Sequence, residues 1–141
     1  MLISDVLGWI LAKKKEGKTM NATKILTPAI LLRLEGASVL LLCIFFYAQH
    51  EGNWIIYLLL LFTPDLSMLG YLINTHVGAY IYNIIHTYVL SIALLAIALL
   101  TNNTLLLLLT LILLSHIGLD RLLGFGLKYP TVFKDTHLNR V

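Results

Sequence analysis

Four side chains in the most apolar part of this chain are of the types that bind divalent metal ions: Asp65, His86, His116 and Asp120. His116 and Asp120 are four residues apart, so in a helix they share one face. Zinc-type sites take three or four histidine and carboxylate ligands, and catalytic sites keep one position for water. A bound divalent metal such as zinc would lower the pKa of that water and produce a nucleophile. The pattern therefore predicts a metal site suited to hydrolysis.

Further polar residues could complete this chemistry. Glu35 would serve as general base, and Arg33 or Arg121 would hold a phosphate or carboxylate group of an amphiphilic substrate. Other residues are expected to line the same pocket without a defined role: Asn83, Ser67, Tyr82, Lys128, Asp135 and His137.

Composition indicates that these residues are carried by membrane-spanning helices. Of 141 residues, 59% are hydrophobic and 12% are charged, whereas soluble domains carry about 25% charged residues. The mean hydropathy is +0.88. Apolar runs of about 20 residues match the thickness of a bilayer. We predict an all-α, integral membrane four-helix bundle with spans at 28–48, 54–73, 78–100 and 104–126.

The distribution of charge predicts the orientation of the spans. Lysines are concentrated in 13–24, and further basic residues follow 120, whereas the loop 49–53 contains Glu51 and no Lys or Arg. By the positive-inside rule both termini are cytoplasmic, as expected for a multi-pass protein of the inner (plasma) membrane. The net charge of +3 comes mainly from these ends. The expected partners are therefore the lipid bilayer, an amphiphilic substrate and a second copy of the chain, and not nucleic acid.

With this orientation, polar residues of all four spans lie in the cytoplasmic half. An ionisable group within a membrane costs about 2.5–3.5 kcal/mol, so such groups usually face the interior of a bundle and pair there. Pro64 precedes Asp65 and can kink the second span, which would open space at this depth. We therefore expect these side chains to meet in one polar site.

The flanking segments leave alternatives open. Residues 1–27 form an amphipathic and basic segment, either an interfacial helix or a frayed tail. Residues 28–126 form the transmembrane domain, and 127–141 form a cytoplasmic tail that is either solvated or folded back as a lid over the site.

The function also has alternatives. The polar residues could be purely structural, fixing the register of the helices. They could instead form the binding site of a non-catalytic ion or small-molecule binding or transport protein, since intramembrane Asp and His are used in proton relays. Whether the chain is an enzyme is left open by the sequence.

Four segments carry a resemblance to a known family: "RLEGASVL", "PDLSMLGY", "YNIIHTY" and "HIGLDRLLGFGLKYPTVFKDTHL". Over residues 30–141 the chain resembles the bacterial membrane proteins grouped as domain of unknown function 4260. This resemblance implies a compact multi-span membrane protein and no particular activity.

A weaker similarity points to the membrane-bound metal-dependent hydrolases, and it would assign Asp65, His86, His116 and Asp120 as metal ligands. The chain departs from that pattern in two places. It lacks the second acidic residue usual after Pro-Asp, and "HTY" reverses the usual Thr-His order.

Overall fold

The computed structural model describes residues 27–140, and the predicted segment 1–27 lies outside this range except for Thr27. The described chain is helical, without a β-strand, and its elements are α2 (Pro28–Gln49), α3 (Trp54–Leu61), η2 (Thr63–Leu72), α4 (Thr75–Ile85), α5 (Tyr88–Leu100), α6 (Thr104–Leu123) and η3 (His137–Asn139). Four stretches are long and apolar enough to cross a membrane: Pro28–Gln49, Trp54–Leu72, Thr75–Leu100 and Thr104–Leu123. The predicted four-span, all-α fold is confirmed.

The second span changes its helical form at Pro64. The α-helix α3 ends at Leu61, and the tighter 3-10 helix η2 begins at Thr63. Proline has no N–H to continue the α-helical hydrogen bonds, and the Thr63 hydroxyl donates to the carbonyl oxygen of Leu60 at 2.7 Å. The break expected at Pro64 is therefore present.

The third span is broken as well, which the sequence analysis did not predict. It starts at Thr75 rather than at 78, because the Asn74 side chain accepts the N–H of Val77 at 2.8 Å and caps α4. Helix α4 ends at Ile85, and Thr87 caps the start of α5. His86 thus lies in the break between two helices.

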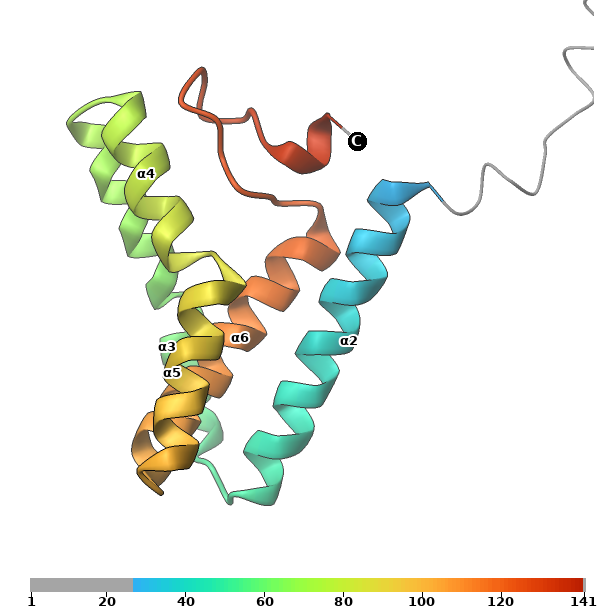
Figure 1. Cartoon of the computed structure of the whole chain (residues 1–141), viewed down its shortest axis with the longest axis vertical. Coiled ribbons are helices and arrows are strands. Elements are labelled where there is room, and N and C mark those ends of the chain that lie inside the picture. The colour runs from blue at the N-terminus through green and yellow to red at the C-terminus, as the bar shows by residue number, and fades with distance from the viewer. Residues whose placement is uncertain (1–26, 141) are drawn as a thin grey trace, which may run out of the picture.

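Helix α2 packs closely against α6. In Figure 1, α2 and the end of α6 form one arm of a V, and α4 with η2 forms the other. A Cβ atom at Gly36 would lie 2.4 Å from Cβ of Arg121 and 2.7 Å from the carbonyl oxygen of Gly118. Only glycine permits this approach of the two backbones, as at other close helix crossings in membranes. The start of α2, the end of α6 and the C-terminal tail lie at the same, open end of the V.

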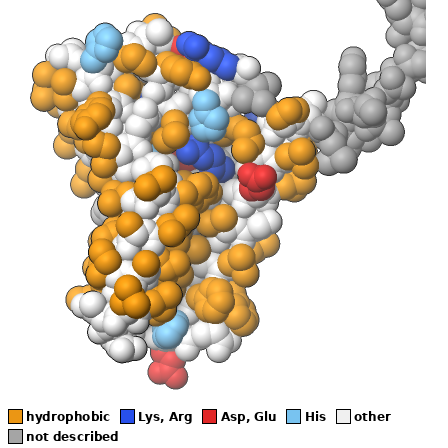
Figure 2. All heavy atoms as spheres, viewed as in Figure 1, with side chains coloured by type: hydrophobic (Ala, Val, Ile, Leu, Met, Phe, Trp, Pro, Cys, Tyr) orange, Lys and Arg blue, Asp and Glu red, His pale blue; other side chains and the backbone are white. Residues whose placement is uncertain are grey.

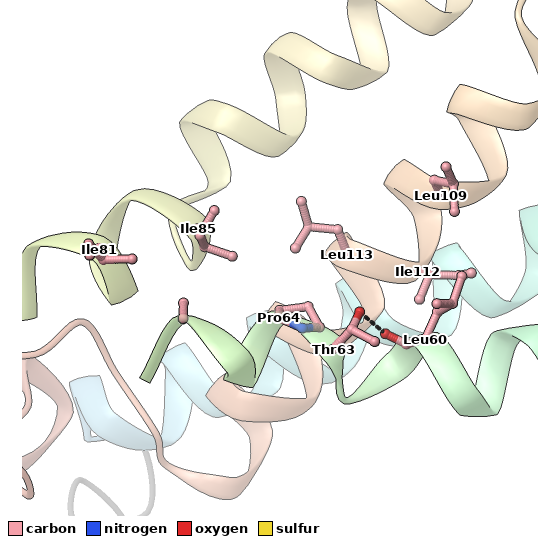
Figure 3. A pocket seen from close by; sticks show the side chains of 9 residues that line it. Leu60, Thr63, Pro64, Ile81, Ile85, Leu109, Ile112 and Leu113 are labelled. Carbon is pink, nitrogen blue, oxygen red and sulfur yellow. Dashed lines mark hydrogen bonds between the residues drawn. The ribbon is translucent and has the colours of Figure 1, made fainter. Parts of the chain in front are cut away.

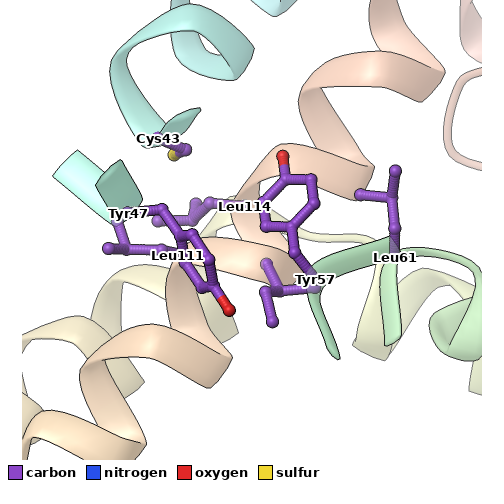
Figure 4. Close-up of a cluster of buried hydrophobic side chains, with 7 residues drawn as sticks. Cys43, Tyr47, Tyr57, Leu61, Leu111 and Leu114 are labelled. Carbon is purple, nitrogen blue, oxygen red and sulfur yellow. The ribbon is translucent and has the colours of Figure 1, made fainter. Parts of the chain in front are cut away.

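The closed end of the V holds an apolar core (Figure 4). Its labelled members are Cys43, Tyr47, Tyr57, Leu61, Leu111 and Leu114. The rings of Tyr47 and Tyr57 lie edge to face with centroids 4.9 Å apart, and the Tyr47 hydroxyl donates to the carbonyl oxygen of Asn53 at 2.9 Å. Tyr57 therefore packs in the protein interior rather than anchoring the chain at the membrane interface.

Leucine, isoleucine and phenylalanine side chains cover the sides of the molecule, whereas lysine and arginine side chains gather at the open end (Figure 2). Such an apolar lateral surface matches contact with lipid, which needs no polar groups. The open end of the V carries the polar residues discussed below.

Candidate metal centre

Asp65, His86, His116 and Asp120 lie together, and one ligand atom from each falls within 4.8 Å of all the others. The Nε2 atoms of His86 and His116 are 3.0 Å apart. Oδ1 of Asp65 is 3.6 Å from each of these nitrogens. Oδ2 of Asp120 is 3.8 Å from the His86 nitrogen and 3.7 Å from the His116 nitrogen.

The two helix breaks and the last turns of α6 position these side chains. Asp65 follows Pro64 in the first turn of η2, and His86 is the residue that ends α4. His116 and Asp120 lie one turn apart on α6. Three spans therefore contribute to the cluster. Both histidines are 2% exposed, whereas the side chain of Asp65 is 39% exposed and opens toward solvent.

His86 is held with one nitrogen directed into the cluster. Its Nδ1 lies 2.9 Å from the carbonyl oxygen of Tyr82, which can only accept, so Nδ1 carries the proton and Nε2 presents a lone pair. The rings of Tyr82 and His86 stack with centroids 3.7 Å apart at an angle of 13°. Nδ1 of His116 is buried and has no hydrogen-bond partner among the described residues.

The spacing of the four atoms is that of a metal coordination shell. A tetrahedral zinc ion with ligands at 2.0–2.1 Å sets neighbouring ligand atoms roughly 3.3–3.4 Å apart. The five distances above range from 3.0 Å to 3.8 Å. The four residues could therefore hold a metal ion.

Groups around the cluster fix Asp120 and the end of α6. The Tyr82 hydroxyl donates to Oδ2 of Asp120 at 2.9 Å. Gly124 adopts φ 94° and ends α6, and the Phe125 N–H donates to the carbonyl oxygen of Asp120 at 2.7 Å. Arg121 donates to the carbonyl oxygens of Phe125 at 3.2 Å and His86 at 3.4 Å. Its guanidinium therefore joins the end of α6 to the break between α4 and α5.

A pocket of about 580 Å³ lies beside the cluster, between α2, η2, α6 and the tail. Asp65 and Asp120 form part of its wall, so the cluster is reached from this pocket. Its other lining residues are Arg33, Met68, Tyr82, Leu123, Gly124, Phe125, Lys128, Phe133, Lys134, Thr136 and Asn139. Three of them are cationic and several are apolar, which makes the pocket suitable for a molecule with both an anionic and an apolar part.

The tail folds back onto this pocket. The amide of Asn83 accepts the N–H of Lys128 at 2.7 Å and donates to its carbonyl oxygen at 2.9 Å. Leu138 is buried, and Thr136 pairs with Lys128 through a backbone bridge. The tail thus lies against α4 instead of extending into solvent.

Lys128 is 8% exposed, and its ammonium nitrogen lies 3.5 Å from the ring centroid of Phe133 and 4.6 Å from that of Tyr82. It makes no ion pair among the described residues. Burial lowers the pKa of Lys128, and the negative charges of Asp65 and Asp120 oppose this shift. The tail therefore delivers a buried cation without a bonded anion to the pocket.

Three other titratable groups of the tail, His137, Asp135 and Arg140, hold its own fold together. His137 accepts the N–H of Leu127 through Nδ1 at 2.8 Å, and burial lowers its pKa. Asp135 accepts Nε–H of Arg140 at 2.9 Å and also bonds to Thr131, and these bonds, that to Arg140 first, lower the pKa of Asp135. Neither His137 nor Asp135 lines the pocket.

Other residues expected at the site lie elsewhere. Glu35 is exposed on α2 and does not line the pocket, whereas Arg33 does. Ser67 lines a separate apolar pocket of about 470 Å³ on the side of the molecule, formed by η2, α4 and α6 (Figure 3). Asn83 contacts the tail and not the four-residue cluster.

The sequence analysis missed the apolar wall of the pocket. Met68, Phe125 and Phe133 line the pocket. They could not be recognised as lining residues from the sequence, because apolar residues make up 59% of the chain. Gly124 offered one signal, because a glycine after the last apolar turn commonly ends a helix in the left-handed conformation. A Cβ at this position would lie 2.7 Å from the guanidinium of Arg33.

Comparison with known proteins settles the family. Residues 29–141 match a family model described as domain of unknown function (DUF4260). The chain belongs to this family. The match includes all four spans, the four-residue cluster and the tail. No curated protein matches the chain, and no solved structure matches it.

Proposed function

We propose that Asp65, His86, His116 and Asp120 bind one divalent metal ion, zinc in the first instance, and that the protein is a metal-dependent hydrolase of an amphiphilic substrate. The observation that carries the proposal is the convergence of four ligand atoms within 4.8 Å. The lone pair on Nε2 of His86 already points into the cluster, and this supports a role as a metal ligand.

Hydrolysis requires a coordination position for water. Asp65 is the most exposed of the four ligands and borders the pocket. His86, His116 and Asp120 would form the constant ligands, and Asp65 would share its position with the attacking water or accept its proton. Glu35, the general base expected from sequence, does not line this pocket, so the proposal gives that role to Asp65.

The setting of the site supports a membrane substrate. The pocket lies at the open end of the V, beside spans that are apolar enough for a bilayer. We place this end on the cytoplasmic side of a bacterial inner membrane by the positive-inside rule. An amphiphile could then present its head group to the cluster while its chain stays in the lipid.

Elemental analysis of protein purified in a neutral detergent without chelator tests the proposal. We expect about one divalent ion per folded chain, with loss of most of it in His116→Ala and a smaller loss in Asp65→Asn. His50→Ala is the matched control, because His50 is exposed in the loop after α2. A folded wild type that carries no metal and takes up none on titration with zinc would overturn the proposal.

A second candidate is supported by the two broken spans. Discontinuous helices at the level of a polar site are typical of ion-binding and transport proteins. The contact between Nε2 of His86 and Nε2 of His116, at 3.0 Å, could pass a proton without metal. Metal-independent proton flux in liposomes, abolished by His86→Gln, would favour this function over hydrolysis.

A further inference from the structure

The pocket beside the four-residue cluster carries more positive charge than is needed to balance the two carboxylates of the cluster. A divalent ion would balance the two carboxylates, Asp65 and Asp120, with both histidines neutral. Three cationic side chains would remain on the pocket wall, Arg33, Lys128 and Lys134. Among residues 27–140, no acidic side chain other than the two ligands lines this pocket.

Lys128 is the most informative of the three. A buried ammonium usually has an anionic or hydrogen-bonding partner, because desolvation of an unpaired charge is costly. Lys128 is 8% exposed as a residue, but its ammonium is not fully enclosed: it lies over the rings of Tyr71, Tyr82 and Phe133, has no ion-pair partner among the described residues, and keeps accessible surface beside the pocket. Its backbone is fixed by both hydrogen bonds of Asn83, so the side chain is positioned and not adventitious.

We propose that this pocket binds the phosphate group of a phosphate monoester with an apolar chain, and that Lys128 is its principal anion-binding residue. A phosphate monoester carries about −1.5 to −2 charge at pH 7 and three acceptor oxygens, which matches three convergent cations better than a single carboxylate does. The apolar part contacts Met68, Leu123 and Phe125 on the same wall. The hydrolysis reaction rests on the proposed metal site. The binding of phosphate does not depend on it.

The reaction that follows is the hydrolysis of the monoester. Asp65, His86, His116 and Asp120 would hold the ion, which would supply an activated water. The oxygen of a water molecule would form the new bond to phosphorus, and the bond from phosphorus to the alcohol oxygen would break. The proton lost by the water is delivered to the departing alcohol oxygen. The products are the free alcohol and inorganic phosphate, so no further reactant is required.

Binding of dodecyl phosphate to the full chain in a neutral detergent tests the inference by calorimetry. Lys128→Gln removes one charge-assisted contact, so we expect binding to weaken about 10- to 100-fold. Lys128→Arg retains the charge and should restore most of the affinity. Arg140→Gln is the matched control, because it removes a tail cation that contacts Asp135 and Tyr129 outside the pocket.

The outcomes distinguish a direct contact of the Lys128 ammonium with phosphate from an indirect effect on docking of the tail. Equal affinity of wild type and Lys128→Gln overturns the inference, as does an equal loss in Arg140→Gln, which would assign the effect to docking of the tail. Dodecanoate binding as tightly as dodecyl phosphate overturns the choice of phosphate. If Lys128→Gln does not fold, dodecyl phosphate must protect Lys128 of the wild type from reductive methylation, and absence of protection overturns the inference.

Metal content separates this inference from the proposed function. Lys128→Gln should retain its metal, since Lys128 is not a ligand. If the wild type carries no metal but binds dodecyl phosphate in a Lys128-dependent manner, the phosphate site stands and the hydrolase proposal falls. If the wild type binds metal but does not bind dodecyl phosphate, the metal site stands and the phosphate site falls.

Discussion

Tyr82→Phe is a minimal perturbation of the proposed metal centre. It removes only the hydroxyl that donates to Asp120 at 2.9 Å and keeps the ring that stacks on His86. Tyr82 is 1% exposed, so phenylalanine fits the same space without a new contact with water. The ligands themselves are unchanged.

The expected loss follows from what the hydroxyl does. It holds Oδ2 of Asp120 at 3.7–3.8 Å from the two histidine nitrogens. Without it, the carboxylate must be ordered when the metal binds, which costs about 0.5–1.5 kcal/mol for a freed side chain. Loss of the hydrogen bond from the Tyr82 hydroxyl adds to this cost. Removing a residue that hydrogen-bonds to a metal ligand typically lowers metal affinity about 10- to 100-fold. We therefore expect zinc affinity to fall by at least about tenfold.

Competition of metal-free protein with a chromophoric chelator measures this change. Tyr57→Phe is the control, because its buried hydroxyl has no hydrogen-bond partner among the described residues and lies in the apolar core. Its removal should leave zinc affinity unchanged. A folded Tyr82→Phe protein with wild-type affinity would refute the reasoning that Tyr82 supports a metal ligand.

Three further changes test the fold and the tail. Gly36→Ala forces a Cβ against the α6 backbone, so thermal unfolding in detergent should show a loss of about 1–3 kcal/mol, and an unchanged midpoint would contradict the close crossing. Burial lowers the folded-state pKa of His137, so the unfolded tail binds a proton first as pH falls, and tail docking should weaken progressively below about pH 6.5. Hydrogen exchange at the Leu127 amide, corrected for its intrinsic rate, should accelerate over that range and not above it. Asn83→Ala removes both bonds to the Lys128 backbone, so we expect faster exchange in the tail and weaker binding of dodecyl phosphate, with metal content retained.

Hydropathy predicted the four spans because length and apolar composition are local properties of the chain. The clustering of His86, His116 and the two aspartates was also expected. Burying an ionisable side chain in the membrane costs free energy, so such groups at one depth usually face the interior of the bundle and pair there. The break after His86 was not predicted. Its signal, the capping residue Thr87, is weak within an otherwise continuous apolar run.

Side-chain direction was the part that sequence could not supply. Arg33 and Glu35 lie on the same turn of α2, yet Arg33 lines the pocket and Glu35 does not. Arg121 follows a candidate ligand directly, yet its guanidinium bonds to backbone carbonyl oxygens. Such differences depend on how α2 rotates against α6, which the close contact at Gly36 determines and composition does not reveal.

The distribution of the ligands over three spans has a consequence for biosynthesis. The segment with Asp65 and the segment with His86 leave the ribosome before Thr104–Leu123, which carries the other two ligands. A chain interrupted before that last span holds an acid and an imidazole that have not met their partners. The four-residue cluster can therefore form only once the last span is in place.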